Sequence, residues 1–185
     1  DAQQTNERVA LELYKQTGQR FRGILYGGFM LTKKGVKVIE YNARFGDPEA
    51  MNVLSILETD FIEICNAIVS GSLASLKISF KNEATVCKYA VPVGYPDSPS
   101  KNFEVFCNPE DHNLYLAAVQ QTAGGLIATG SRTAAIVGIN QKIGIAEKLA
   151  EKGVSEVKGN LFHRKDIGTG ALINLRIKHM KEILR

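Results

Sequence analysis

The sequence predicts an α+β fold in two parts: antiparallel strands with helices over residues 1–76, then a small β-rich domain with flanking helices over residues 77–185. Three observations lead to this prediction. Two apolar runs of strand length are joined by a Lys-Lys-Gly turn, which is typical of an antiparallel hairpin. Apolar residues at helical spacing follow as far as a Ser-Gly-Ser segment. Beyond that segment, short strand-like runs alternate with turn residues, so the change of pattern marks the expected domain boundary.

The first part is expected to open with a helix that ends near Gly18. A strand over residues 21–31 and a second strand over residues 36–44 follow, and the turn between them should make them pair antiparallel. Gly27 and Gly28 lie inside the first of these strands. Glycines at such positions mark either a bulge or a close approach by another molecule, such as a nucleotide, and we favour the bulge.

Two helices are expected after the hairpin. The first spans Glu49–Leu57, and the second begins at Asp60, where an Asp-x-x-Glu pattern is typical of a capping box. Gly71 should end the second helix, because glycine readily adopts the left-handed conformation found at helix C-termini. Both helices carry apolar residues at helical spacing, so both should turn one face inward.

Short strands and turns should make up most of the second part, with candidate strands at residues 78–80, 84–93, 103–106, 114–119, 126–129 and 133–138. An amphipathic helix is expected over residues 140–152, with Ile143 and Leu149 among its inward residues and Gly153 as its end. Residues 171–184 should form a second amphipathic helix.

Composition places the chain among ordinary globular proteins, with 185 residues of which 44% are hydrophobic and 23% charged. The net charge is +4, but the basic residues are scattered and not interleaved with aromatics, so we expect no nucleic-acid partner. No apolar run reaches membrane-spanning length, so we expect no membrane partner. Three separated cysteines without metal-binding spacing are typical of reduced thiols, which predicts a cytoplasmic protein.

The second strand of the hairpin carries an unusual row of polar residues. Because side chains alternate along a strand, Glu40, Asn42 and Arg44 should project to the same side. A carboxylate and a carboxamide are oxygen ligands suited to Mg²⁺, and a guanidinium is a fixed cation for a phosphate or carboxylate. Asp47 and Pro48 should then start a helix, as the N-cap and the first helical residue. A polar edge strand before an ordinary capped helix would give the same pattern without function, so spacing alone leaves both interpretations open.

The block over residues 38–49, Val-Ile-Glu-Tyr-Asn-Ala-Arg-Phe-Gly-Asp-Pro-Glu, closely resembles the signature of the phosphoribosylamine–glycine ligase family of ATP-grasp enzymes. The segments at residues 21–30 and 164–168 are similar to the same family and occur in the same order. The resemblance therefore covers nearly the whole chain. It implies that residues 1–76 are the C-terminal part of an ATP-grasp domain and residues 77–185 the family's β-rich C-terminal domain.

The resemblance implies an ATP-dependent carbon–nitrogen ligase of purine biosynthesis. That enzyme joins glycine to 5-phosphoribosylamine through a glycyl phosphate, gives glycinamide ribonucleotide, ADP and phosphate, and uses ATP with Mg²⁺ or Mn²⁺. By this resemblance Glu40 and Asn42 would bind the metal. Arg44 would be the catalytic and substrate-binding residue, in contact with the transferred phosphoryl group or the carboxylate. Asp47 would orient the glycine amine, or would serve only as an N-cap.

Nothing in the chain resembles the family's N-terminal domain or the ATP-grasp half that carries the nucleotide-clamping lysine. We therefore expect a C-terminal portion of a longer enzyme that needs the missing N-terminal domains, binds Mg-ATP weakly and turns over nothing alone. Two alternatives remain, namely another ATP-grasp carboxylate–amine ligase and a non-catalytic fragment that acts through partner binding. A second polar cluster, at residues 163–168, could hold a phosphate or cap the last helix, and we favour the structural role.

Overall fold

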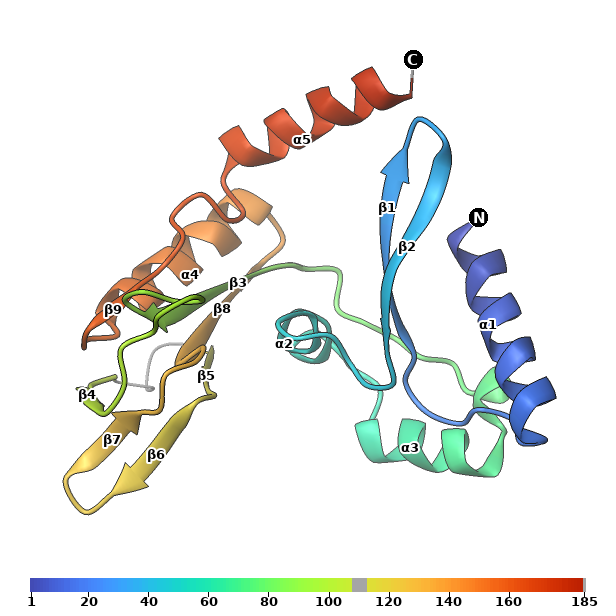
Figure 1. Cartoon of the computed structure of the whole chain (residues 1–185), viewed down its shortest axis with the longest axis horizontal. Helices are drawn as coiled ribbons and strands as arrows, with labels where there is room; N and C mark the ends of the chain where they lie inside the picture. Colours follow the sequence, from blue (N-terminus) through green and yellow to red (C-terminus); the bar gives the residue numbers. More distant parts are fainter. Residues whose placement is uncertain (108–112, 185) are drawn as a thin grey trace. The chain divides into compact units, whose positions relative to one another are not determined.

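The computed structural model describes residues 1–107 and 113–184. The chain forms two compact units, whose elements are labelled in Figure 1. Unit 1 comprises Asp1–Ala50, Leu57–Lys81 and the chain from Ile177 onwards, and unit 2 comprises Met51–Ile56 and Asn82–Arg176. The main change of unit falls between residues 81 and 82, a few residues after the expected boundary. No helix in the described residues is long and apolar enough to cross a membrane.

Unit 1 is built around an antiparallel hairpin of β1 (Tyr26–Thr32) and β2 (Gly35–Asn42). The register shifts between Gly28 and Phe29, which pair with Glu40 and Val38, so Ile39 is an extra residue on β2. The predicted bulge is therefore confirmed. The first strand begins at Tyr26 and not at residue 21, and the last pair of the hairpin joins Tyr26 to Asn42.

Three helices flank the hairpin in the sequence: α1 (Ala2–Thr17), α2 (Glu49–Leu54) and α3 (Phe61–Ser70). The Asp60 carboxylate caps α3 by accepting hydrogen bonds from the backbone N–H of Ile62 at 2.7 Å and of Glu63 at 3.2 Å. Gly71 ends α3 in the left-handed conformation, with φ of 77°, as predicted. The prediction that α2 runs to Leu57 is wrong, because Leu57 leaves the helix to form a β-bridge with Phe80.

Unit 2 contains two antiparallel sheets. The larger has the strand order β5-β8-β3-β9, and the smaller has the order β4-β7-β6. Their strands are β3 (Ala84–Pro92), β4 (Phe103–Val105), β5 (Asn113–Leu116), β6 (Val119–Thr122), β7 (Gly125–Ala128), β8 (Ala134–Asn140) and β9 (Leu161–Phe162). The strand expected over residues 114–119 is thus divided between β5 and β6, and the one expected over residues 78–80 forms only the bridge at Phe80. The α+β fold class is confirmed.

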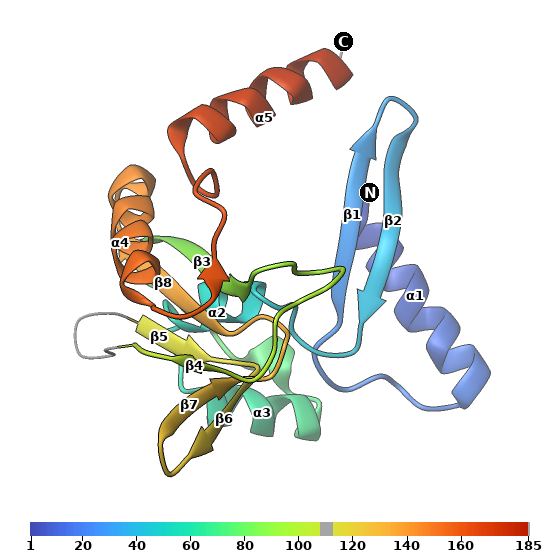
Figure 2. The ribbon, with the colours of Figure 1, turned by 60° about the vertical axis from the view of Figure 1, so that its left-hand side comes forward.

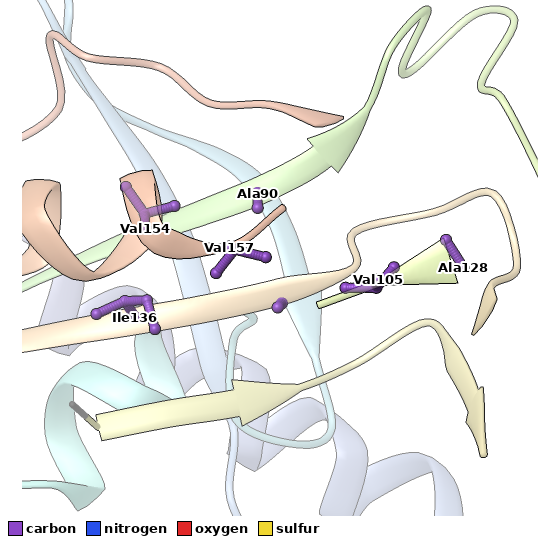
Figure 3. Close-up of a cluster of buried hydrophobic side chains, with 7 residues drawn as sticks. Ala90, Val105, Ala128, Ile136, Val154 and Val157 are labelled. Atoms are coloured by element: carbon purple, nitrogen blue, oxygen red, sulfur yellow. The ribbon is translucent and has the colours of Figure 1, made fainter. Parts of the chain in front are cut away.

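The main core of unit 2 joins both sheets to the end of a helix, α4 (Ile143–Glu156). Its small and β-branched side chains form one cluster, and all but Ala134 are labelled in Figure 3: Ala90, Val105, Ala128, Ala134, Ile136, Val154 and Val157. All of them are 9% exposed or less. Burial of these methyl and methylene groups is the main favourable term that holds the unit together.

Helix α4 packs unusually close to the larger sheet, along β3 and β8 (Figure 2). A Cβ atom added to Gly138 in β8 would collide with the Ala146 carbonyl oxygen and lie 2.7 Å from the Ala150 backbone nitrogen. Only small residues fit such a contact, and α4 has a fully buried alanine at both positions that approach Gly138, Ala146 and Ala150.

Two expectations about α4 are therefore wrong. Gly153 lies buried inside the helix, which continues to Glu156, so this glycine does not end it. Ile143 and Leu149 are 47% and 40% exposed, since large side chains cannot enter the narrow contact with β8. The last helix, α5 (Gly170–Ile183), agrees with its predicted range but has no buried residue.

Candidate functional site

Glu40 and Asn42 lie side by side near the end of β2. The Asn42 Nδ2 donates a hydrogen bond of 3.0 Å to the Glu40 Oε1. Glu40 is exposed and Asn42 half-buried, so neither side chain belongs to the hydrophobic core. The carboxylate and the carboxamide therefore share one accessible face of the strand.

The two faces of the hairpin have different surroundings. On one face, the Phe29 and Tyr41 rings are in edge-to-face contact at 6.0 Å, and the Tyr41 hydroxyl donates a 2.7 Å hydrogen bond to Asn6 in α1. Paired residues of an antiparallel hairpin lie on the same face, so the other face carries Tyr26 opposite Asn42 and Gly28 opposite Glu40. Because Gly28 has no side chain, nothing on β1 covers the Glu40 carboxylate directly.

The donor set at Glu40 and Asn42 fits a divalent metal of the magnesium type. One oxygen of Glu40 accepts the Asn42 amide N–H, which leaves the second carboxylate oxygen and the amide oxygen as ligands. Nowhere in the described residues do three or more His, Cys, Asp or Glu side chains form a group that could hold a metal. Two protein oxygens are nevertheless enough for Mg²⁺, which usually keeps several waters and binds substrate phosphates.

Arg44 lies beyond the strand, and the prediction that the strand continues to it is wrong. Strand β2 ends at Asn42, because its partner β1 provides no residue before Tyr26 for pairing. Arg44 is exposed, and its Nη1 donates a 2.6 Å hydrogen bond to the backbone carbonyl of the next residue, Phe45. The guanidinium thus belongs to the turn that follows the Glu40 and Asn42 pair.

Asp47 is an exposed residue of the same turn. The helix after it begins at Glu49, one residue beyond the predicted first helical residue, Pro48. The Ala50 N–H donates to the Gly46 carbonyl at 2.9 Å, which bonds the turn to the first residues of α2. The predicted helix start is therefore one residue too early, and the capping and substrate-binding roles of Asp47 stay predictions.

Sequence reasoning missed the contact between Tyr26 and Glu49 at this turn. Gly46 is buried, and a Cβ atom there would collide with the Glu49 Oε2 and lie 3.0 Å from the Tyr26 Cε1. Burial raises the pKa of the Tyr26 hydroxyl, and so do its hydrogen bond to Glu49 and the negative charges of Glu49 and Glu40. The available signal in the sequence was Gly46, which has a carboxylate three residues after it, Glu49, and an aromatic residue in the preceding hairpin, Tyr26.

Unit 2 holds a second polar centre that sequence reasoning also missed. The Lys88 side chain on β3 is fully buried, and its Nζ donates to the Glu147 Oε1 at 2.7 Å and the Glu151 Oε2 at 2.6 Å. A third hydrogen bond, of 3.0 Å, goes to the Lys165 carbonyl oxygen, and the other Glu151 oxygen lies 3.0 Å from the His163 Nε2. The signal was a lysine in the middle of an apolar strand, with two glutamates four residues apart on the helix that covers it.

Charge effects in this Lys88 network follow from its geometry. Burial lowers the pKa of Lys88, but the hydrogen bonds and charges of Glu147 and Glu151 outweigh burial, so the pKa is raised. Burial raises the pKa of Glu151, but hydrogen bonds from Lys88 and His163 reverse the effect and lower it. The network fastens the segment at residues 163–168 to the sheet, and the favoured role of that cluster as a cap for the last helix stays a prediction.

The sequence matches two family models, Phosphoribosylglycinamide synthetase, ATP-grasp (A) domain, over residues 2–50, and Phosphoribosylglycinamide synthetase, C domain, over residues 85–170. It is 53% identical over 172 residues to a Phosphoribosylamine--glycine ligase of Methanosarcina barkeri, covering 92% of this chain and 40% of the relative. It is 47% identical over 189 residues to the Phosphoribosylamine--glycine ligase of Methanocaldococcus jannaschii, covering 100% of this chain and 42% of the relative.

A crystal structure of Phosphoribosylamine--glycine ligase from Thermotoga maritima superposes with a TM-score of 0.71 at 26% identity. The match covers 84% of this chain and 39% of the crystallised one. The chain thus spans about 40% of the length of the relatives that it matches.

Proposed function

Because the chain belongs to the phosphoribosylglycinamide synthetase family, we propose that it supplies part of an ATP-dependent ligase of purine biosynthesis. The reaction joins glycine to 5-phosphoribosylamine through a glycyl phosphate and gives glycinamide ribonucleotide, ADP and phosphate. The observation that carries the proposal is the exposed Glu40 and Asn42 pair, two oxygen ligands held together by a 3.0 Å hydrogen bond on one strand face.

In this proposal, Glu40 and Asn42 hold Mg²⁺ or Mn²⁺ through the carboxylate and amide oxygens that their mutual hydrogen bond leaves available. A metal held there would supply neutralisation of phosphate charge, which phosphoryl transfer from ATP requires. The hydrogen bond fixes the two side chains relative to each other before any ligand binds, so little reorganisation is needed on binding.

Arg44 and Asp47 act on the substrates. The Arg44 guanidinium has the charge and fork geometry to bind the transferred phosphoryl group or the glycine carboxylate. In the structure it donates to the Phe45 carbonyl, which is a neutral acceptor. An anionic group in its place would accept a stronger, charge-assisted hydrogen bond. The Asp47 carboxylate, exposed on the same turn, binds and orients the glycine amine.

The chain needs additional polypeptide to act, since it spans about 40% of its relatives. We propose that the part it does not cover supplies the N-terminal domains and most of the nucleotide site. Helix α1 has no buried residue, and its Val9 and Leu13 line an open hollow of about 390 Å³, a surface suited to such a neighbour. The cysteines Cys65, Cys87 and Cys107 form no disulfide in the described residues, which accords with a reducing compartment, and we place the enzyme in the cytoplasm.

The test uses a chimera in which this chain replaces the aligned part of the Methanosarcina barkeri relative. ADP release that requires both glycine and 5-phosphoribosylamine is the activity expected. Glu40→Ala should lower its rate roughly a thousandfold, because several kcal/mol of transition-state stabilisation depend on the metal. Mn²⁺ binding, measured by electron paramagnetic resonance, should weaken in parallel. The matched control is Glu63→Ala, which removes an exposed carboxylate from α3 in the same unit and should change neither quantity.

The same chimera separates the alternatives. Release of ADP with an amino acid other than glycine would indicate another carboxylate–amine ligase. Full ATP turnover by the Glu40→Ala chimera would indicate a fragment that acts by binding alone. The isolated chain should form no glycinamide ribonucleotide, and a measurable rate would refute the inference that it is only one part of the site.

A further inference from the structure

The turn between β2 and α2 is fixed from several sides. Its Phe45 ring contacts the Phe61 ring of α3, with centroids 6.1 Å apart, and the Gly46 carbonyl accepts the Ala50 N–H at 2.9 Å. A further attachment is the hydrogen bond between the Tyr26 hydroxyl of β1 and the Glu49 carboxylate at the start of α2.

This last contact has a specific geometry. Both side chains lie against Gly46, in the space that a Cβ atom of that residue would need. The Glu49 carboxylate therefore folds back across the turn towards the strand, although Glu49 as a residue remains exposed. Tyr26 pairs with Asn42 across the hairpin, so its ring lies on the face that carries the Glu40 and Asn42 pair.

We propose that Tyr26 and Glu49 are positioning residues, a clamp that holds the turn at residues 43–48 against the strand face of Glu40 and Asn42. The inference rests on the proposed ligase function and deepens it, because the clamped turn carries Arg44 and Asp47. Neither clamp residue needs to touch a substrate. The Tyr26 phenol and the Glu49 carboxylate bind each other. Through that bond they hold the guanidinium and the carboxylate of the turn, Arg44 and Asp47, in fixed positions relative to the proposed metal ligands.

A direct metal role for Glu49 fits the structure less well. Its carboxylate is bound to the Tyr26 hydroxyl and is directed across the turn at Gly46. A purely structural role is the serious competitor, since a hydrogen bond across a turn also adds stability. The two roles differ in what they predict for turnover and for local mobility.

The test uses four variants of the chimera: Tyr26→Phe, Glu49→Leu, Glu49→Gln and the Tyr26→Phe/Glu49→Leu double variant. Tyr26→Phe and Glu49→Leu should each lower kcat about tenfold, the order expected for losing a hydrogen bond to a charged group. KM for ATP should stay within about twofold, because the adenine and ribose contacts are elsewhere. The double variant should be no worse than either single variant, since both remove the same bond. Glu49→Gln keeps an oxygen acceptor and should recover most of the activity.

The control is Tyr41→Phe, the same chemical change on the opposite face of the hairpin. It removes the 2.7 Å hydrogen bond to Asn6, so it should lower the melting temperature without changing kcat. Amide hydrogen exchange of residues 43–50, measured by mass spectrometry, should speed up about tenfold in Tyr26→Phe and stay unchanged in Tyr41→Phe.

These measurements keep the two proposals apart. An inactive wild-type chimera, or an active Glu40→Ala chimera, would overturn the ligase function, and hydrogen exchange would still test the clamp. Unchanged exchange at residues 43–50 in Tyr26→Phe would overturn the clamp whatever the activity. Faster exchange with an unchanged kcat would mean that the bond is structural only, and the positioning role would be wrong.

Discussion

Replacement of Lys88 by methionine is the sharpest test of how unit 2 is held together. Methionine keeps the length and most of the volume of the lysine stem but removes its charge and its three hydrogen bonds. The Glu147 and Glu151 carboxylates then face each other across an apolar side chain, and the Lys165 carbonyl loses the Nζ that donates to it at 3.0 Å. We expect a large loss of folding stability, although methionine fills nearly the same space in the core as the lysine side chain.

The magnitude follows from the burial of the three groups. Removing one partner of a buried ion pair costs about 3–5 kcal/mol, because the other charge is left uncompensated. Here the lysine side chain is 0% exposed, but Glu147 is 14% and Glu151 is 30% exposed, so water screens part of the remaining charge. The loss should therefore lie near the lower end, about 3 kcal/mol, which for a domain of this size lowers Tm by about 12 °C or more.

Urea unfolding at pH 7, followed by circular dichroism, measures the difference directly. Lys15→Met is the matched control, because Lys15 forms an equally short 2.7 Å pair with Glu12 in which both side chains are 57% exposed. It should cost no more than about 0.5 kcal/mol. The triple variant Lys88→Met/Glu147→Leu/Glu151→Leu removes the stranded charges and should regain most of the loss. A cost below about 1 kcal/mol for Lys88→Met, or a triple variant no more stable than the single one, would refute this reasoning.

Two further predictions concern the same helix and sheet. Because the pKa of Glu151 is lowered in the folded state, its stabilising contribution should be complete above about pH 4.5 and lost as the pH falls through the folded pKa; Glu151→Gln should flatten the decline of unfolding free energy between pH 5 and pH 3. Gly138→Ala should destabilise the chain by about 3 kcal/mol, because its Cβ meets the backbone of α4. Gly144→Ala, whose Cβ meets nothing within 4 Å, should be neutral or stabilising by about 0.5–1 kcal/mol. Urea unfolding checks both glycine variants, and equal effects at the two positions would contradict the close contact inferred for Gly138.

Much of unit 1 could be predicted because its signals are local. The Asp60 cap, the Gly71 helix end and the hairpin turn each depend on a few neighbouring residues whose backbone preferences decide the outcome. The placement of Glu40 and Asn42 on one face also follows from a local rule, the alternation of side chains along a strand. Such features can be predicted without knowing which residues distant in the sequence come into contact with them.

Features of unit 2 that depend on distant contacts could not be predicted. Gly153 has the sequence signal of a helix end, but it is buried inside α4, the helix that packs closely against Gly138 of β8. Ile143 and Leu149 appear apolar enough to be buried, and the same close approach turns them outward. The Lys88 network joins residues from β3, α4 and the segment after β9, so no window of the sequence contains all of its members.

The bulge in the hairpin connects the local prediction to the proposed site. Alternation of side chains is reliable only where pairing is regular, and Ile39 interrupts it immediately before Glu40. Because the extra residue precedes the pair, Glu40 and Asn42 keep the spacing of two that puts them on one face, and their 3.0 Å hydrogen bond is possible. A bulge two residues later would separate them. The bulge therefore lies immediately before the ligand pair and leaves Glu40 and Asn42 on the same face, so the proposed site begins at the first residue after the bulge.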